Sequence, residues 1–309
     1  MACALCLKNY DLSPIIVERE NALGGMARLN PYPNDGLLGR VGESGEQNAE
    51  AFSRHVARTA IETWLGAWPR QLHRNSDGRF TLAVEFSGLR MPQVLSSTAI
   101  VIATGTRFAG QEWLDTVENA RRMAARGRVH VGAPWALRPG SEPSSHVAVI
   151  GGGDNAFDVA RMLAQRNVRV SIVMRSQAPR ALPLMVRRLQ TFERAGMAQV
   201  LAGREVRALE DRDCKVRLRL DDRRKIDVDH VLLLCGYRPN SDEAFLAGLG
   251  LAQDKRGYLA VDGNAETSCP GAFAIGDVSN PAHPSIATAI AAGSLAAREI
   301  AKRLSDSLG

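Results

Sequence analysis

The chain has 309 residues, of which 45% are hydrophobic and 23% charged, with a formal net charge of +6 and a pI near 9.3. This composition is typical of a soluble globular protein, and the length suffices for two domains of roughly 100 to 200 residues each. No segment approaches the ~18 to 20 continuous apolar residues of a membrane span. The apolar run Met1–Leu7 has no basic residues ahead of it, so it is not a secretory signal, and we expect a cytoplasmic location.

The excess of basic residues has two interpretations. It either steers an acidic protein partner toward the surface or only keeps that surface solvated. The basic clusters are scattered along the sequence, and none of them contains an interleaved aromatic residue: Arg121-Arg122, Arg187-Arg188 and Arg223-Arg224-Lys225. The pattern therefore does not favour binding to nucleic acid.

The first elements resemble part of a dinucleotide-binding unit. A helix-like run covers residues 1–10, and the apolar strand Ile15–Val17 follows and ends at Glu18. In such a unit the order is strand, Gly-rich turn, helix, strand and then an acidic residue ~20 positions beyond the turn. On that spacing the first strand and its turn would precede Met1. We therefore expect a chain that starts inside this unit, holds FAD poorly, and regains it when upstream residues are added.

The next elements alternate between helix and strand. Gly24-Gly25 marks a place where backbone passes close to another group, and residues 49–65 read as a long helix. Residues 80–86 alternate like an antiparallel strand, and the buried strand 99–103 ends at Thr104-Gly105. This alternation of helices and strands predicts an α/β fold.

A complete dinucleotide-binding motif occurs in mid-chain. The apolar strand 146–150 leads into Gly151-Gly152-Gly153-Asp154-Asn155-Ala156, and the helix 157–166 and the strand 168–173 follow. In this G-x-G-x-x-A pattern the first glycine permits a tight turn and the second lets backbone approach a pyrophosphate. The small third residue allows the helix to pack closely, with its N-terminus facing the phosphates. The motif in this context predicts nucleotide binding.

The residues after the second strand select the nucleotide. An NAD site places a carboxylate there for the ribose 2′-hydroxyl, whereas an NADP site uses cations for the 2′-phosphate. The chain has no Asp or Glu between Asp158 and Glu193, and Arg175, Ser176 and Arg180 lie where the acid would be. We therefore expect NADPH, although surface arginines without this role are the alternative.

The last third supplies two more strand ends and a helix. A buried strand at 231–234 ends at Cys235-Gly236, and a second strand leads into Gly276-Asp277. A helix rich in small residues is expected from about residue 285 to 304. Neither tandem repeats nor low-complexity segments occur, apart from the dinucleotide-binding unit appearing twice.

Six motifs follow one another as they do in a known family: Glu18, Gly24-Gly25, Ala103-Thr104-Gly105, Gly151 to Ala156, Gly236-x-x-Pro239-Asn240 and Gly276-Asp277. In this order the chain resembles the thioredoxin-reductase-like branch of the flavin pyridine-nucleotide oxidoreductases. The resemblance implies an α/β fold of two Rossmann-like, three-layer ββα dinucleotide-binding domains. It implies a discontinuous, N-terminally truncated FAD domain at 1–108 and 239–309, interrupted by an NAD(P)H domain at 109–238.

The resemblance also implies roles for individual residues. Glu18 would hold the adenosine ribose, Gly24 and Gly25 would pass near the flavin nucleotide, and Asp277 would bind the ribityl-phosphate region. The last helix would direct its N-terminus at the flavin, where its dipole stabilises negative charge. The expected cofactor-binding residues are Glu18, Gly24, Gly25, Met26, Asn30, Ala103, Thr104, Gly105, Gly151, Gly153, Asp154, Asn155, Ala156, Arg175, Ser176, Arg180, Gly236, Gly276, Asp277, Ala287 and Thr288.

The cysteines argue against an internal dithiol. Disulfide reductases of this family carry a thiol pair either at the place of residues 134–137 or after the Gly-Gly motif, and no cysteine occurs between Cys6 and Cys214. Cys3 and Cys6 have the spacing of a redox pair, but small apolar side chains on a helix that packs against a sheet favour a packing role. The Cys and His residues show no metal-site spacing, so we expect no metal.

Three functions remain open. The first is a flavoprotein that passes electrons from NADPH through FAD to an external ferredoxin, flavodoxin, quinone or small molecule. The second is a low-molecular-weight disulfide reductase acting directly from flavin, and the third is a nucleotide-binding protein without turnover. His283, between Asp277 and the last helix, is the candidate proton donor, with a merely structural loop histidine as the alternative. The resemblance suggests a homodimer.

Overall fold

The computed structural model describes residues 1–30, 32–34, 36–88, 91–133, 145–280 and 282–306. The chain forms two compact units, one made of Met1–Arg107 with Arg238–Gly309 and the other of Phe108–Tyr237. It passes from one to the other along β7 (Thr106–Phe108) and returns along β16 (Tyr237–Pro239), and these two strands pair with each other. The division lies next to the expected boundaries at 108/109 and 238/239; which nucleotide each unit binds stays a prediction.

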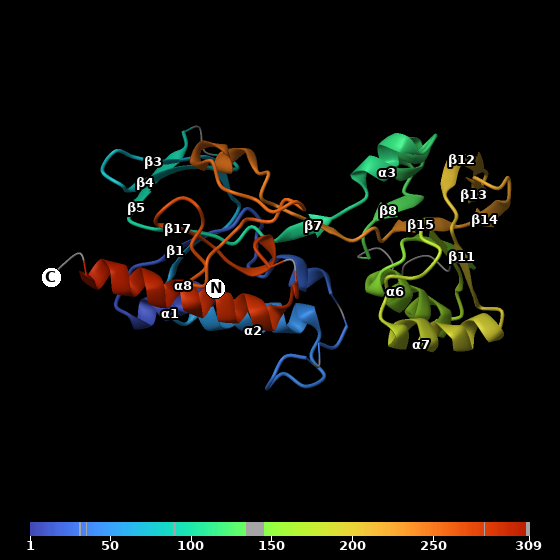
Figure 1. Cartoon of the computed structure of the whole chain (residues 1–309), viewed down its shortest axis with the longest axis horizontal. Coiled ribbons are helices and arrows are strands. Elements are labelled where there is room, and N and C mark those ends of the chain that lie inside the picture. Colours follow the sequence, from blue (N-terminus) through green and yellow to red (C-terminus); the bar gives the residue numbers. More distant parts are fainter. Residues whose placement is uncertain (31, 35, 89–90, 134–144, 281, 307–309) are drawn as a thin grey trace. The chain divides into compact units, whose positions relative to one another are not determined.

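The discontinuous unit, unit 1, has helices on one side of its parallel strands and an antiparallel sheet on the other (Figure 1). Its elements are α1 (Ala2–Asn9), β1 (Ile15–Val17), η1 (Gly25–Leu29), α2 (Gly45–Ala57), β2 (Glu62–Trp64), β3 (Ala67–Arg74), β4 (Phe80–Phe86), β5 (Gln93–Ser97), β6 (Ile100–Ile102), η2 (Ala244–Leu249), β17 (Ala272–Ala274), η3 (Gly276–Val278) and α8 (Ile286–Asp306). The parallel strands form two separate pairs, β1 with β2 and β6 with β17. The antiparallel sheet has the order β3-β4-β5.

Alternating side chains of β17 join the layers of unit 1. Ala272 and Ala274 pack with the apolar residues of β3 and β4, whereas Phe273 faces α1 and α8. Successive side chains of a strand point to opposite faces, so one short strand contributes to two cores. The layers therefore enclose β17 completely, and all three of its residues are buried.

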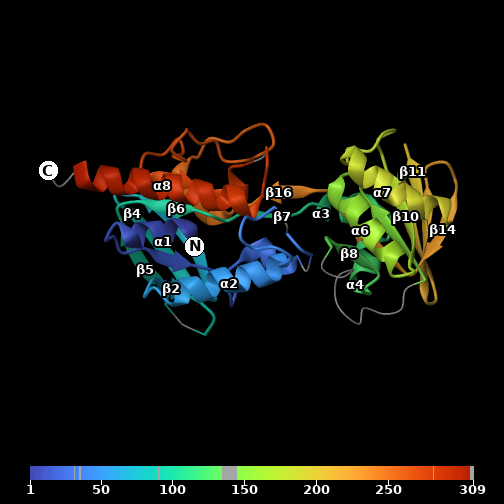
Figure 2. The ribbon, with the colours of Figure 1, turned by 90° about the horizontal axis from the view of Figure 1, so that it is seen from below.

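The continuous unit, unit 2, contains one parallel sheet with the strand order β11-β10-β9-β15-β8. Its elements are α3 (Gln111–Thr116), α4 (Ala120–Ala125), β8 (Val129–Val131), β9 (His146–Ile150), α6 (Asp154–Gln165), β10 (Arg169–Met174), α7 (Pro183–Arg194), β11 (Ala198–Ala202), β12 (Val206–Arg212), β13 (Lys215–Leu220), β14 (Lys225–Val228) and β15 (His230–Leu233). Helices α6 and α7 lie together over this sheet (Figure 2). The antiparallel sheet β12-β13-β14 packs on its other face through residues such as Leu209 and Leu218.

The expected α/β fold with two Rossmann-like, three-layer units is thus confirmed. One expected element is wrong. Residues 49–65 are not a single helix, because α2 begins at Gly45 and ends at Ala57, and residues 62–64 form β2. Ser44 and Gln47 form a reciprocal capping box that fixes the true start of α2. Pairing with β1 holds Glu62–Trp64 extended, which is a contact that the local pattern does not show.

Candidate functional site

The glycine turn of unit 2 lies where β9 meets α6. Gly151 has a φ of 152°, and a Cβ atom at this position would lie 2.2 Å from the carbonyl oxygen of Leu234. Only glycine fits such a close approach between two parallel strands. The turn is held in place because the amide of Gly151 donates to Val173 and the amide of Leu234 donates to Ile150.

The N-terminus of α6 follows the turn and is open. The N-cap is Gly153, which has no side chain to cap the helix. A Cβ atom at this position would meet no atom within 4 Å. The amides of Asp154 and Asn155 have no acceptor in the preceding turn of a helix, so they are donors for a bound anion. Ala156 is fully buried beneath the turn, as close helix packing requires. The arrangement therefore suits a pyrophosphate.

The cationic segment after β10 is bonded to this turn. The amides of Arg180 and Ala181 donate to the carbonyl oxygen of Gly152, at 2.8 and 3.1 Å, and the amide of Leu182 donates to the Asp154 carboxylate at 2.7 Å. Arg175, Ser176 and Arg180 are exposed. Within the described residues neither arginine forms an ion pair. Both guanidinium groups are therefore available to a phosphate next to the turn.

The strand on the other side of β9 completes this edge of the sheet. The chain leaves β9 toward β10, while β15 lies on the opposite side, so the C-terminal ends of β9 and β15 form the kind of switch point where nucleotides bind. Cys235 and Gly236 follow β15 here, and Asn155 donates to the Tyr237 hydroxyl at 2.8 Å. Burial raises the pKa of the Cys235 thiol, and the charges of Arg175 and Arg180 partly oppose that effect. The two arginines and Cys235 thus occupy the same edge.

In unit 1 two strand ends far apart in the sequence are locked together. The hydroxyl of Thr104 donates to the carbonyl oxygen of Asn240 (2.9 Å), and the Asn240 side chain donates back to the carbonyl oxygen of Thr104 (2.8 Å). The amide of Asn240 also donates to Gly105, whose φ is 65°. Asn240 is 3% exposed, so these bonds satisfy an otherwise buried amide. The motif Pro239-Asn240 was visible in the sequence, but nothing local indicated its partner.

Gly276 and Asp277 lie beside the first turns of α8. A Cβ atom on Gly276, whose φ is 71°, would be 3.5 Å from the Cβ of Ala289. The Asp277 side chain is half-buried and has no hydrogen bond or ion pair within the described residues. Burial alone raises the pKa of this carboxyl. A half-buried acceptor without a protein partner suits the hydroxyl groups of a bound ligand.

Side chains at the start of α8 satisfy some of the backbone groups there. Ser285 accepts from the amide of Thr288 at 3.2 Å, and the Thr288 hydroxyl lies within bonding distance of the His283 carbonyl oxygen at 2.9 Å. Ala287 is exposed in the first turn. Its amide, like that of Ile286, precedes the first intrahelical bond and can receive an acceptor. His283 is exposed, and Asn280 holds its backbone on both sides.

The Gly-Gly segment packs on α2. Gly24 has a φ of 126°, and a Cβ atom there would lie 2.7 Å from the Cβ of Ala49, whereas Gly25 faces open space. Met26 belongs to η1, and Asn30 follows it and accepts from Tyr32 through its side chain. Gly24 therefore permits close packing, and Gly25 leaves room for a ligand.

Glu18 is held by bonds of its own. Its amide donates to Trp64 in β2, and its carboxylate accepts from the amide of Glu20 at 3.0 Å. Those bonds place it at the C-terminal end of β1. In the described part of the chain they do not connect it to Asp277 or to the Thr104 strand end.

The cysteines divide by burial. Cys3 is 4% exposed and packs with Phe273 and Ala296, and burial raises the pKa of its thiol to about 11. Cys6 contacts Ser294. Both thiols are free, so Cys3 has the packing environment that the sequence favoured over a redox role. The alternative place for a thiol pair, residues 134–137, lies outside the described residues.

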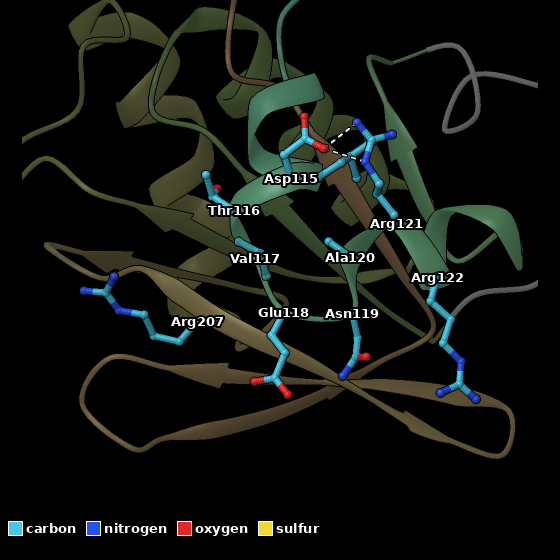
Figure 3. A pocket seen from close by; sticks show the side chains of 10 residues that line it. Asp115, Thr116, Val117, Glu118, Asn119, Ala120, Arg121, Arg122 and Arg207 are labelled. Carbon is cyan, nitrogen blue, oxygen red and sulfur yellow. Dashed lines mark hydrogen bonds and ion pairs between the residues drawn. The ribbon is translucent and has the colours of Figure 1, made fainter.

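A surface hollow of about 340 Å³ occurs elsewhere in unit 2, along residues 114–122 and Arg207 (Figure 3). Several of its charged groups are engaged with other side chains: Arg121 pairs with Asp115, and Arg207 pairs with Glu205. It contains none of the expected cofactor-binding residues. We therefore assign the chemistry to the strand ends and not to this hollow.

In the described residues no group of three or more His, Cys, Asp or Glu side chains is arranged to hold a metal ion. A membrane crossing would need a long apolar helix, and none is found over the same part of the chain.

Comparison with known proteins places these sites in context. The sequence model described as pyridine nucleotide-disulphide oxidoreductase matches residues 2–294. A ferredoxin–NADP reductase of Limosilactobacillus fermentum is 28% identical over 277 residues, which cover 87% of this chain and 79% of that protein. The fold is similar to thioredoxin reductases of Lactococcus lactis (TM-score 0.82, 20% identity, 99% and 95% of the two chains) and T. acidophilum (0.81, 23%, 100% and 95%).

Proposed function

This chain belongs to the pyridine nucleotide-disulphide oxidoreductase family, and we propose that it passes electrons from NADPH through FAD to an external acceptor without an internal dithiol. It is a flavin-dependent NAD(P)H oxidoreductase with FAD and NADPH as cofactors. The observation that carries the proposal is the bonding of the cationic segment to the glycine turn of unit 2. When bound, FAD accepts a hydride from NADPH and releases electrons to the acceptor.

The residues of unit 2 fit NADPH. The amides that begin α6 bind the pyrophosphate, and Arg175 and Arg180 bind the 2′-phosphate with Ser176 between them. Charge-assisted bonds from a guanidinium to a phosphate are among the stronger polar contacts in proteins. No Asp or Glu occurs between Asp158 and Glu193, so this segment has no carboxylate to accept from the ribose 2′-hydroxyl of NADH. NADPH is therefore favoured over NADH.

The residues of unit 1 fit a flavin nucleotide. Asp277 would accept hydrogen bonds from the ribityl hydroxyls, and the open amides at the start of α8 would stabilise negative charge on the flavin. Gly24 and Gly25 allow close passage of the nucleotide, and Glu18 binds the adenosine ribose. Thr104 and Gly105 belong to the neighbouring strand end, which the bonds between Thr104 and Asn240 hold in place.

The relatives named ferredoxin–NADP reductase support a redox protein as acceptor. The absence of cysteine between Cys6 and Cys214 supports direct transfer from flavin. The structural likeness to thioredoxin reductases keeps one alternative, direct reduction of a low-molecular-weight disulfide. The other alternative is a nucleotide-binding protein without turnover.

The test begins with the visible spectrum of the purified protein. Bound flavin gives a yellow protein whose absorbance bleaches when NADPH is added without oxygen. Rates of NADPH oxidation are then compared with ferredoxin, flavodoxin, menadione and glutathione disulfide as acceptors. The matched variant Cys3→Ala with Cys6→Ala keeps the wild-type rate if no dithiol takes part. A colourless protein that still binds NADPH would instead favour the form without turnover, and glutathione disulfide as the fastest acceptor would favour the disulfide reductase.

A further inference from the structure

The positive charge of the molecule lies almost entirely in unit 2. Unit 2 has 22 Lys and Arg residues and 15 Asp and Glu residues, which gives a formal net charge of +7. Unit 1 has 17 basic and 18 acidic residues, which gives −1. A partner attracted by charge is therefore attracted to the nucleotide-binding unit that carries the glycine turn.

Within unit 2 many basic side chains are neutralised by neighbours. In the antiparallel sheet, Arg217 forms two bonds to Asp227, and Arg212 pairs with Glu210. Arg161 pairs with Asp158 on α6. These pairs leave little net charge on the surfaces that they cover, so the excess must reside elsewhere.

Helix α7 carries a basic face without acidic residues. Arg187, Arg188 and Arg194 lie on the same side as Leu184 and Thr191, because residues three, four, seven and ten positions apart share a helix face. All five are exposed, whereas Leu189, on the other side, is fully buried. Within the described residues none of the three arginines has an ion pair. We call these three arginines with Leu184 the α7 face.

The α7 face is also partly apolar and firmly supported. Leu184 is 46% exposed, and Leu182, just before the helix, is 57% exposed. The helix packs on α6 and β11 (Figure 2). Just before it, the amide of Leu182 donates to the Asp154 carboxylate beside the glycine turn. Arginines around exposed leucines on a rigid element are typical of protein interfaces, in which Arg is enriched and Lys depleted.

We propose that the α7 face is the docking surface for an acidic electron-acceptor protein. This inference rests on the proposed function and names the partner and its place on the molecule. The three unpaired guanidinium groups steer and orient a carboxylate-rich surface, and Leu182 and Leu184 supply the apolar contact. Nucleic acid is a poorer fit, because the face has no aromatic side chain on which bases stack. The bonding of α7 to the turn keeps the docked protein beside the nucleotide site of the same unit.

The test is a charge reversal with a matched control. The variant Arg187→Glu with Arg188→Glu is compared with Arg223→Glu with Lys225→Glu, which makes the same charge change on exposed residues of unit 2 outside α7. NADPH-dependent reduction is measured with an acidic ferredoxin and with the neutral quinone menadione. At low ionic strength the α7 variant loses about tenfold in kcat/KM for ferredoxin, and the loss shrinks as salt is added. The control variant stays within about twofold of wild type.

Menadione reduction and the KM for NADPH stay unchanged in the α7 variant, which separates docking from cofactor binding. Equal losses in both variants would overturn the proposal, because they would show only an effect of overall charge. A raised KM for NADPH would show that Arg187 or Arg188 belongs to the phosphate site. Wild-type protein that reduces menadione but not ferredoxin would overturn the docking surface and leave the proposed function standing. If neither acceptor is reduced, the proposed function fails. The docking surface is then tested by the salt-dependent binding of ferredoxin, which should be weaker for the α7 variant than for the control variant; equal binding would overturn it.

Discussion

The backbone amide of Arg180 donates a 2.8 Å hydrogen bond to the carbonyl oxygen of Gly152, so the segment that carries the cations is fixed to the turn expected to hold the pyrophosphate. The Asp154 carboxylate adds a bond from Leu182. A site on a loop is precise only when its backbone is held in this way. Turn and segment therefore form one structure, which under the proposed function would bind the pyrophosphate and the 2′-phosphate together.

Removing the cations should change the choice of nucleotide. With Arg175→Ala and Arg180→Ala together, we expect the KM for NADPH to rise about 30-fold, because each lost charge-assisted bond is worth roughly 1 kcal/mol or more. The KM for NADH, which has no 2′-phosphate, should stay close to its wild-type value. Steady-state rates with menadione as acceptor give both KM values. Equal changes for the two nucleotides would mean that these arginines do not read the phosphate.

Replacement by alanine should affect stability very differently at Gly151 and at Gly153. Gly151→Ala places a methyl group 2.2 Å from the Leu234 carbonyl oxygen at a φ of 152°, so we expect the free energy of unfolding to fall by about 3 kcal/mol. Gly153→Ala meets open space at a φ of −98° and should unfold like wild type, within about 0.5 kcal/mol. Under the proposed function that same methyl group would lie beside the bound phosphates, so it should weaken NADPH binding. Urea unfolding and titration of NADPH fluorescence measure the two effects; loss of stability in both variants would contradict the assignment.

The sequence revealed the glycine turn because its residues are consecutive and lie between a clear strand and a clear helix. It did not reveal α7, because that helix is polar on average and Leu189 is its only buried residue. Nor did it reveal the bonds between Thr104 and Asn240, which are 136 positions apart. Patterns along the chain report local geometry, whereas such pairings depend on how distant strands come together.

Cys3 should react more slowly than an exposed thiol. Since burial raises the pKa of Cys3 to about 11, only about one molecule in a thousand carries the thiolate at pH 8. We expect iodoacetamide to modify Cys3 at least about a hundredfold more slowly than the exposed Cys214. Mass spectrometry of timed digests gives the rates, and denatured protein is the control in which both react. Fast modification of Cys3 in the folded protein would revive the redox interpretation.

The role of His283 as a proton donor can be tested with two acceptors, one that takes up protons and one that does not. Its backbone is held by Asn280, and its exposed side chain can deliver a proton at the start of α8. If it does, His283→Ala slows reduction of menadione, which takes up protons, by about a hundredfold, the lower end of general acid catalysis. Ferricyanide, which takes up electrons alone, should be reduced at the wild-type rate. Unchanged rates with both acceptors would leave His283 a structural residue.

Replacing Asp277 should raise the stability of the flavin-free protein and weaken flavin binding. Burial raises the pKa of its carboxyl above 3.8, so the native state binds this proton more tightly than the unfolded state does. The stabilising contribution of that form is complete below pH 3.8 and is lost as the pH rises through the raised pKa. At pH 7 the flavin-free Asp277→Asn variant should therefore be more stable than flavin-free wild type, and the difference should vanish below pH 3.8. The same change removes a charged acceptor for ribityl hydroxyls and should weaken flavin binding about tenfold. Urea unfolding at the two pH values and flavin titration measure these opposite effects, and a variant that loses stability at pH 7 would show that the carboxylate has a protein partner instead of a ligand.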